Sequence, residues 1–316
     1  MNISTRMKRI QASLKQPRMY STLATQIFKY VLLIGISFII LFPFFVKVSS
    51  SLMSLKDLSD KTVKYIPRNP TFDNLIYVIT QSNYFKALWN TLWISSLTAV
   101  IQTSVCTCVS YGFARFRFKG RGILFALVML TMIVPRQTTI VSYFMTFRYF
   151  DPFRMMTLLI GQPLSLVGSP IPVFLQSLCG LGLKSALYIY VLRQYFIGLP
   201  IELNEAAGVD GAGVLRTFWK IMVPLARPMM ITVFLLAFSW QWTDSYYASL
   251  FFNDYSILPN VLNQVAILGA DSYGGSLQSS VYVNCAALLI ILPLLILYIC
   301  TQKWLIGGIE RSGLVG

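Results

Sequence analysis

The chain of 316 residues contains no histidine and little charge. Histidine is the commonest general base and the commonest metal ligand, so its absence argues against histidine-based catalysis and leaves few residues for a metal-dependent reaction. Charged residues make up 12% of the sequence, against roughly 25% in a soluble domain, and hydrophobic residues make up 56%. This composition excludes a water-soluble enzyme and a disordered protein. It indicates a chain that lies mostly in lipid.

Acidic residues and cysteine pairs are also scarce. The 26 basic residues outnumber the 11 acidic ones and give a net charge of +15. In a soluble protein this charge would suggest nucleic acid, but in a membrane protein it identifies the cytoplasmic loops. The 5 cysteines lie within or beside apolar segments and include no Cys-x-x-Cys pair. We therefore interpret them as small apolar packing residues.

Apolar segments recur from about residue 30 to residue 305, and they predict an all-α membrane protein with six spans. The predicted spans are Tyr30–Val46, Ala87–Ala114, Gly122–Phe147, Pro172–Phe196, Pro228–Phe251 and Val281–Cys300. Pro135 and Arg136 interrupt the third span. Glycines and prolines between Met155 and Leu192 argue against one straight helix there, so we expect Met155–Ile171 to be a re-entrant or surface segment.

Basic residues without acidic neighbours predict which loops are cytoplasmic. The N-terminal tail carries Arg6, Lys8, Arg9, Lys15 and Arg18, and the loop after the second span carries Arg115, Arg117, Lys119 and Arg121. Six spans return the C-terminus to the same side. We expect a cytoplasmic tail over residues 1–26, a membrane domain over 27–305 and a cytoplasmic tail over 306–316.

The loop between the fourth and fifth predicted spans, residues 199–228, contains signals for a short helix. Pro200 suits a first helical position, and Glu202 and Glu205 suit the positive N-terminal end. Gly211 is a suitable left-handed stop, so the sequence predicts a helix from Pro200 to Asp210.

A second pattern follows this helix. Four apolar residues fall at positions i, i+3, i+4 and i+7, with Arg216 and Lys220 on the opposite face. The apolar residues are Leu215, Phe218, Trp219 and Met222. The spacing predicts a second short helix, amphipathic and lying in the membrane surface.

The order of residues in this loop resembles the EAA motif of ATP-binding-cassette importer permeases. The matching residues are Glu205-Ala206-Ala207-x-x-Asp210-Gly211-Ala212, then Phe218, Ile221 and Pro224-Leu225. Further stretches are similar to the sugar-importing branch of that family, which includes the maltose-type permeases. They are Asn90-Thr91-Leu92, Ser110-Tyr111-Gly112-Phe113-Ala114-Arg115-Phe116, Arg193-Gln194-Tyr195-Phe196-x-x-Leu199-Pro200 and Trp240-x-Trp242-x-Asp244.

The resemblance implies that the first short helix is a coupling helix, seated in a groove of a cytoplasmic ATPase subunit. The implied coupling residues are Glu205, Ala206, Ala207, Asp210, Gly211, Ala212, Phe218, Ile221 and Pro224. ATP and Mg would be used by that partner, since this chain has no G-x-x-x-x-G-K-[ST] loop, and we expect this chain to bind no cofactor or metal. Two features depart from the family: Thr243 stands before Asp244 where asparagine is usual, and the last residues lack a lysine.

The resemblance also implies the assembly and its cargo. The chain would be a permease without enzymatic activity in a prokaryotic cell membrane, moving a mono- or oligosaccharide. Its partners would be a second permease, two ATPase subunits and an extracytoplasmic solute-binding protein. The alternatives are an ion-coupled secondary transporter, which would need titratable residues within the spans, and a membrane-embedded enzyme, which would need a carboxylate partner for Asp244.

Polar and aromatic residues inside the spans are candidates for the sugar path, because sugars present hydroxyl groups and apolar faces. The candidates are Asn90, Gln102, Tyr111, Trp240, Trp242 and Asp244. The competing interpretation is that such aromatic residues form the interfacial belt and that the amides join helices. Arg136 and Lys184 are charged residues in apolar surroundings, and we expect both to extend to the outer interface.

Overall fold

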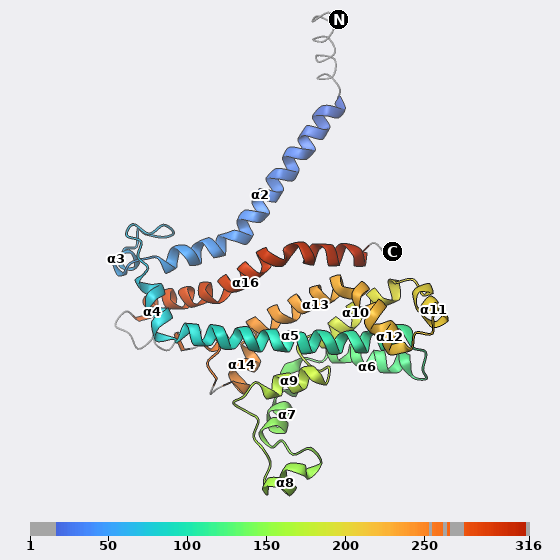
Figure 1. The fold of residues 1–316 in the computed structure, drawn as a ribbon. Helices are drawn as coiled ribbons and strands as arrows, with labels where there is room; N and C mark the ends of the chain where they lie inside the picture. Colours follow the sequence, from blue (N-terminus) through green and yellow to red (C-terminus); the bar gives the residue numbers. More distant parts are fainter. Residues whose placement is uncertain (1–16, 253–254, 262–263, 266–274, 314–316) are drawn as a thin grey trace, which may run out of the picture. The chain divides into compact units, whose positions relative to one another are not determined.

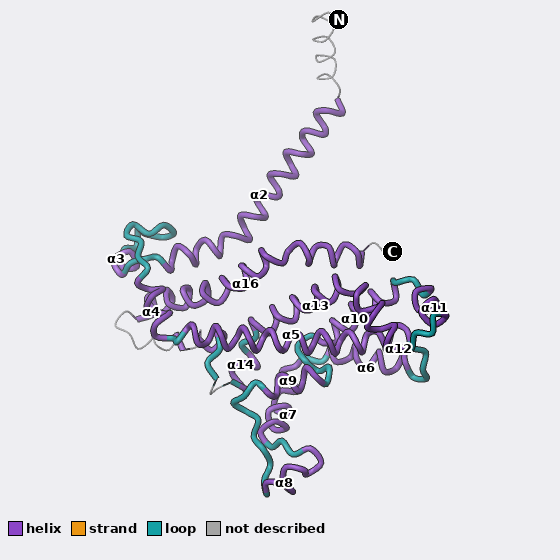
Figure 2. Tube along the Cα trace, in the orientation of Figure 1, coloured by secondary structure: helices purple, strands orange, loops and turns teal. Residues whose placement is uncertain are grey.

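The computed structural model describes residues 17–252, 255–261, 264–265 and 275–313, and over these ranges it contains helices, loops and one isolated bridge between Phe150 and Leu164 (Figure 1 and Figure 2). The predicted all-α class is therefore confirmed for the described residues. The basic residues Arg6, Lys8, Arg9 and Lys15 and the last residues, 314–316, lie outside them. The chain divides into two units, which meet between Leu75 and Ile76.

The first unit consists of a long apolar helix and a polar loop. Helix α2 (Pro17–Ser51) contains the first predicted span, and α3 (Leu55–Ser59) follows it. The loop after α3 is held by the buried Asp57 carboxylate, which accepts hydrogen bonds from the Asn69 backbone N–H at 2.9 Å and from the Asn69 side chain at 3.3 Å. Asn74, in α4 (Asp73–Gln81), donates to the Met53 carbonyl at 2.8 Å.

The second unit is organised around helix α5 (Tyr84–Arg115), which contains the second predicted span. Figure 1 shows α5 running along α10 (Ser185–Gly198) and α13 (Val223–Thr243), and α5 packs against both. Its buried face consists largely of small polar residues, and the Ser110 hydroxyl donates to the Ile189 carbonyl of α10 at 2.9 Å. Small residues allow helices to approach closely in lipid, where polar groups also join them. The remaining long helix, α16 (Gly275–Gly313), packs against α13 and contains the sixth predicted span.

The third predicted span is two helices rather than one. Helices α6 (Arg121–Ile133) and α7 (Arg136–Arg148) meet at an angle of 98°. The interruption falls at Pro135, as the sequence indicates, because proline lacks an N–H and keeps the residue before it extended; Val134 has ψ 121°. Helix α6 has 13 residues, about 20 Å, which is short of the roughly 30 Å of a bilayer core.

The fourth predicted span, Pro172–Phe196, is also wrong as a continuous helix. Helix α9 (Ile171–Leu178) ends six residues before α10 begins, and the chain between them turns at Gly180 and Lys184, which have φ of 72° and 59°. Met155–Ile171 contains only one short helix, α8 (Met155–Ile160), after a 3₁₀ turn at Pro152–Arg154. Neither α8, with 6 residues, nor α9, with 8 residues, is long enough to cross a bilayer.

The fifth predicted span and the second amphipathic helix both need new bounds. Helix α13 ends at Thr243, and α14 (Tyr246–Phe251) is separate. At its other end α13 is continuous with α12 (Val214–Thr217) through a π-helical turn at Phe218–Met222. Pro224 lacks the N–H that an α-helix would bond to the Lys220 carbonyl. The Val223 N–H bonds to the Phe218 carbonyl, five residues earlier, which is the π-helical spacing. The predicted second surface helix is therefore the beginning of the fifth span.

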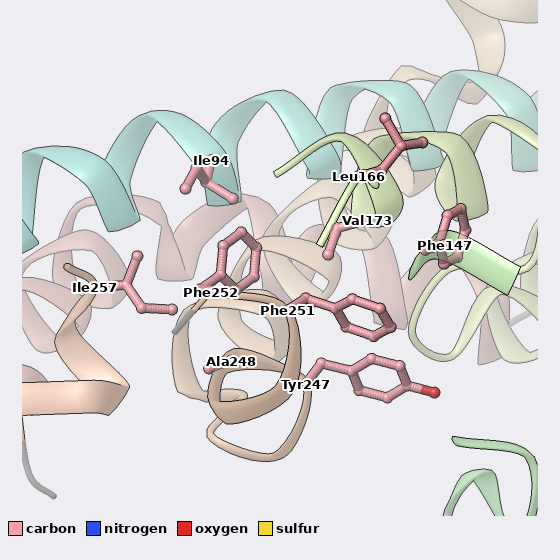
Figure 3. Packing of buried hydrophobic residues seen from close by; sticks show 9 residues of the cluster. All are labelled: Ile94, Phe147, Leu166, Val173, Tyr247, Ala248, Phe251, Phe252 and Ile257. Atoms are coloured by element: carbon pink, nitrogen blue, oxygen red, sulfur yellow. The ribbon is translucent and has the colours of Figure 1, made fainter. Parts of the chain in front are cut away.

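Four described helices are long and apolar enough to cross a membrane, and the bent pair α6–α7 is a fifth candidate. The shorter segments α7, α9 and α14 are joined to α5 by one hydrophobic cluster (Figure 3). Figure 3 shows the Tyr247 and Phe251 rings of α14 side by side, and their centroids are 5.8 Å apart. Phe147 of α7 meets the Phe251 ring edge-on at 5.8 Å, and Val173 of α9 and Ile94 of α5 belong to the same cluster.

Candidate functional site

The segment with the motif forms a short helix, α11 (Glu202–Val209), with Glu202 and Glu205 in its first turn. It ends in two hydrogen bonds, from the Ala212 N–H to the Ala207 carbonyl at 2.8 Å and from the Gly211 N–H to the Gly208 carbonyl at 3.0 Å. This is the Schellman arrangement, which needs a left-handed residue after the helix. Gly211 has φ +73°. The left-handed stop predicted at Gly211 is confirmed.

A cluster of buried side chains attaches α11 to the long helices. We call it the Tyr111 cluster, and its residues are Tyr111 of α5, Phe196 of α10, and Phe218, Met222 and Ala226 at the beginning of the fifth span. The Tyr111 ring centroid lies 4.9 Å from that of Phe218 and 5.6 Å from that of Phe196. Aromatic pairs at these distances contribute about 0.5–1.5 kcal/mol each beyond burial.

Polar contacts complete this attachment. The Asn204 side chain of α11 donates to the Tyr111 hydroxyl at 3.4 Å, and the Arg115 guanidinium donates to the Leu199 carbonyl at 2.7 Å. Leu199 and Leu203 pack against the Tyr111 cluster. Helix α11 is therefore bonded directly to α5 and packs, through Leu203, against the cluster in which α5, α10 and the residues before and in α13 meet.

The outer surface of this segment is exposed and partly apolar. Val209 is 88% exposed and Leu215 is 74% exposed, and Glu205, Ala206 and Asp210 are exposed beside them. Ala207, by contrast, is buried against its own chain. The motif therefore divides into residues that face outward and residues that hold the segment to the bundle, among them Phe218 and Ile221.

The four apolar residues of the amphipathic pattern do not share one buried face. Phe218 and Met222 lie in the Tyr111 cluster, whereas Leu215 and Trp219 are exposed. Each pair is spaced at i, i+4, so the helix has two apolar edges and only one is covered within this chain.

A cavity of about 570 Å³ lies where the broken helices meet. Its lining includes Pro135, Arg136, Tyr143, Gly182, Lys184, Trp240, Asp244, Tyr246 and Tyr247. Of the residues predicted for a sugar path, Trp240 and Asp244 line this cavity. The Lys184 ammonium lies 4.9 Å from the Trp240 ring centroid, and the lining thus includes a cation next to an aromatic ring.

Arg136 and Lys184 line the cavity, and their extension to the outer interface stays a prediction. The half-buried Arg136 guanidinium donates to the carbonyls of Leu181 and Gly182 and lies 5.6 Å from the Tyr247 ring centroid. The Gly182 carbonyl also accepts from the Ser185 N–H at 3.1 Å, so Arg136 adds a bond from α7 to the segment between α9 and α10. The sequence feature that could have indicated this role of Arg136 is a charged residue directly after a proline inside an apolar segment.

The other predicted sugar-path residues are buried and bonded within the bundle. Gln102 donates to the Leu183 carbonyl and to the Ser185 hydroxyl at 2.8 Å, and Asn90 donates to the Ser256 carbonyl at 2.8 Å. The Trp242 indole N–H donates to the Ile290 carbonyl at 3.0 Å. Tyr111 lies in its own cluster beside α11. The structure thus does not bring these four to the cavity, and their contacts are those of residues that join helices.

No group of three or more Asp, Glu or Cys side chains among the described residues is arranged to hold a metal ion. The acidic side chains at α11 are Glu202 and Glu205 in the helix and Asp210 directly after it, and the charged side chains that line the cavity are Arg136, Lys184 and Asp244.

Comparisons with known proteins agree with the motifs. Residues 104–310 match the family described as "Binding-protein-dependent transport system inner membrane component". The chain is 26% identical over 291 residues to the maltodextrin transport system permease protein MalD of Streptococcus pneumoniae, covering 92% of this chain and 95% of that one. It is 28% identical over 298 residues to the arabinooligosaccharides transport system permease protein AraQ of Halalkalibacterium halodurans, covering 92% and 98%.

A solved structure shares the fold. It is one chain of a bacterial ABC transporter involved in the import of the acidic polysaccharide alginate, with a TM-score of 0.69 and 22% sequence identity, and the match covers 90% of this chain and 97% of that one.

Proposed function

The chain belongs to the family of binding-protein-dependent transport system inner membrane components, and we propose that it carries a mono- or oligosaccharide through a prokaryotic cell membrane. An extracytoplasmic solute-binding protein delivers the sugar, and two partner ATPase subunits supply the energy. The attachment of α11 to three long helices through the Tyr111 cluster carries this proposal, because a permease without an ATP site needs such a link to its ATPase. ATP and Mg bind to the partner, and this chain needs no cofactor of its own.

The proposed topology has six crossings with both termini in the cytoplasm, a membrane domain over residues 27–305 and short tails on either side. The third crossing is the bent pair α6–α7, and the fourth is the broken pair α9–α10. The bond from Arg115 to the Leu199 carbonyl supports one common side for the basic loop and α11, because it joins the end of α5 to the segment before α11. Positively charged loops face the cytoplasm, where the ATPase lies.

In this topology the exposed side of α11 is the surface that docks on the ATPase. Glu205 pairs with a basic residue of the partner, and Val209 fills an apolar part of its groove; both side chains are exposed in this chain. Pairing in a partly desolvated groove strengthens a charge-assisted hydrogen bond. Residues Ala207, Phe218, Ile221 and Pro224 act from the inner side, where they position the segment.

The cavity is the proposed sugar path. The Asp244 carboxylate accepts hydrogen bonds from sugar hydroxyl groups, Lys184 donates to sugar oxygens, and Trp240 supplies an apolar surface for a sugar ring. This combination of an aromatic face with a few convergent polar groups is typical of sites for small polar ligands. A second permease would close the open side of the cavity.

The test is reconstitution of the complete transporter with Glu205→Lys, measuring uptake, stimulation of ATP hydrolysis and retention of the ATPase subunits. Charge reversal at the docking surface should lower all three, while Asp73→Lys, the same change on an exposed residue of α4, should lower none. Unchanged values for Glu205→Lys would show that α11 is not the ATPase contact. Uptake of labelled maltodextrins and arabino-oligosaccharides tests the cargo, and transport of a non-sugar solute alone would contradict it.

A further inference from the structure

Two arginine side chains lie together on the surface of α6 and α10, away from the cavity and from α11. Arg121 is the first residue of α6, and Phe125 lies one turn later on the same face of that helix. The Arg193 guanidinium of α10 lies 4.1 Å from the Phe125 ring centroid. Since α6 packs against α10 and Arg193 contacts a ring one turn from Arg121, the two arginines are on the facing sides of these helices.

Neither guanidinium has an acidic partner. Within the described part of the chain, neither Arg121 nor Arg193 makes an ion pair with a carboxylate. Arg121 donates to the Phe116 carbonyl at 3.2 Å, and the Arg193 Nε atom is buried without a hydrogen-bond acceptor. Two like charges repel, and a buried donor without an acceptor costs free energy. An anion bound between them would remove both costs.

The surroundings indicate what kind of anion fits. No residue of α6 is buried, and Leu124, on the same side of the helix as Arg121 and Phe125, is exposed. Arg193 precedes the end of α10 at Gly198 by five residues, about 7.5 Å of helix. The arginine pair therefore lies near a helix end with an apolar surface leading away from it, which matches the headgroup and the chains of a lipid.

We propose that Arg121 and Arg193 bind the phosphate of an anionic phospholipid, whose acyl chain lies along the exposed side of α6. The planar guanidinium group suits this role, because it can donate two parallel hydrogen bonds to phosphate oxygens while its face stays against the Phe125 ring. The bound headgroup neutralises the repulsion between the two helices and ties α6 to α10. Arg121 and Arg193 belong neither to the lining of the cavity nor to α11.

The experiment uses the complete transporter complex, purified in a neutral detergent and stripped of lipid. Phosphatidylglycerol, phosphatidylcholine or inorganic phosphate is added, and bound lipid is counted by native mass spectrometry. The double variant Arg121→Gln with Arg193→Gln is compared with Arg117→Gln with Lys119→Gln, which removes the same charge from two exposed residues of the adjoining loop. Arg121→Gln alone changes a residue at the end of a helix and serves if the double variant does not assemble.

The expected result is that phosphatidylglycerol binds the unmodified complex more tightly than phosphatidylcholine, and that the double variant weakens this binding about tenfold or more. Arg121→Gln alone should weaken it in the same direction, and the loop variant should leave it unchanged. Equal retention of phosphatidylglycerol in all complexes would overturn the proposal. A second result would also overturn it. If millimolar inorganic phosphate stabilised the unmodified complex and not the double variant, and displaced no lipid, the site would belong to a soluble phosphate.

Discussion

Two glycines at the end of α11 allow one substitution to be tested in two backbone conformations. Gly208 lies within the helix, and Gly211 follows it with φ +73°. A Cβ atom at either position would meet no other atom within 4 Å. Gly208→Ala and Gly211→Ala therefore add the same methyl group to the same exposed region without a steric clash. They differ only in what the backbone requires.

The expected effects have opposite signs. Alanine is more favourable than glycine inside a helix by about 0.5–1 kcal/mol, so Gly208→Ala should stabilise α11. A left-handed conformation costs a residue with a Cβ about 1–2 kcal/mol, so Gly211→Ala should destabilise the hydrogen bonds of the Gly211 and Ala212 N–H groups. A cost of that size changes the equilibrium between closed and open helix ends by a factor of about 5–30.

The measurement is hydrogen exchange of peptides covering residues 204–214, in the permease complex without its ATPase. Exchange should become faster by about that factor in Gly211→Ala and slower in Gly208→Ala. In the reconstituted transporter, Gly211→Ala should lower uptake and leave ATP hydrolysis less responsive to the loaded binding protein. If both variants exchange at the same rate, the left-handed stop does not hold the helix end. Normal coupling in a Gly211→Ala protein with faster exchange would show that this helix end is not needed for transmission.

Three further predictions concern the helix break, the first unit and the topology. A Cβ atom at Gly182 would lie 2.8 Å from the Ser177 hydroxyl oxygen and 2.9 Å from the Gln102 amide nitrogen, so Gly182→Ala should cost about 1–3 kcal/mol in thermal unfolding of the complex. Gly122→Ala, which meets no atom within 4 Å, is the matched control, and equal melting of the two would contradict the tight packing of the break. The hydrogen bond from the Asn69 backbone N–H keeps the pKa of Asp57 below its ordinary value of 3.8, so its contribution to stability is present above about pH 4 and is lost as the pH falls through the lower folded pKa. The protection of residues 54–71 against hydrogen exchange, taken relative to the unprotected rate at each pH, should therefore stay high at pH 5–7 and fall only below pH 4. Asp57→Asn should lower this protection at neutral pH, and a variant as protected as the parent would exclude this role. Single cysteines at Lys61 and Lys119 in a cysteine-free protein should react from opposite sides, only Lys61→Cys from outside, and outside reaction of both would refute the six-crossing topology.

The sequence predicts well those features that depend on local chemistry. Helices α2, α5 and α16 include the predicted spans Tyr30–Val46, Ala87–Ala114 and Val281–Cys300, because hydropathy over twenty residues is a local property. The stop at Gly211 is predicted for the same reason, since it follows from the conformations that glycine alone adopts readily.

The breaks are harder to predict because they depend on residues far away in the chain. The segment between α9 and α10 can leave the helix because Gln102 of α5 and Arg136 of α7 donate to its carbonyls at Leu181, Gly182 and Leu183. Backbone groups in lipid must be bonded within the protein, so a break is stable only where such partners are present. A hydropathy pattern contains no information on these partners, and it therefore extends the fourth span through the break.

The same limit applies to the site. Tyr111 is a polar aromatic residue in an apolar helix, which suits a sugar path as well as it suits packing against α11; only the meeting of α5, α10 and the start of α13 decides between them. For Arg136 the charge in the sequence suggests a position at the membrane interface, and only the structure shows that this residue lines the cavity and bonds to the Leu181 carbonyl.

The arrangement of α10 and α13 explains how movement at one region can reach the other. One end of each helix lies at the Tyr111 cluster, through Phe196 and Ala226. Both helices also reach the cavity, α10 through Ser185 and α13 through Trp240 and Thr243. Phe196 lies eleven positions after Ser185, about 17 Å along the helix, and Trp240 lies fourteen positions after Ala226, about 21 Å. An uninterrupted helix of this length, such as α10, transmits a displacement as a rigid element, whereas α13 contains Pro228 near its start and the break before Ser185 separates α10 from α9. A shift of α11 can therefore move the α10 and α13 sides of the cavity without moving α9, which stays in the cluster around Phe251.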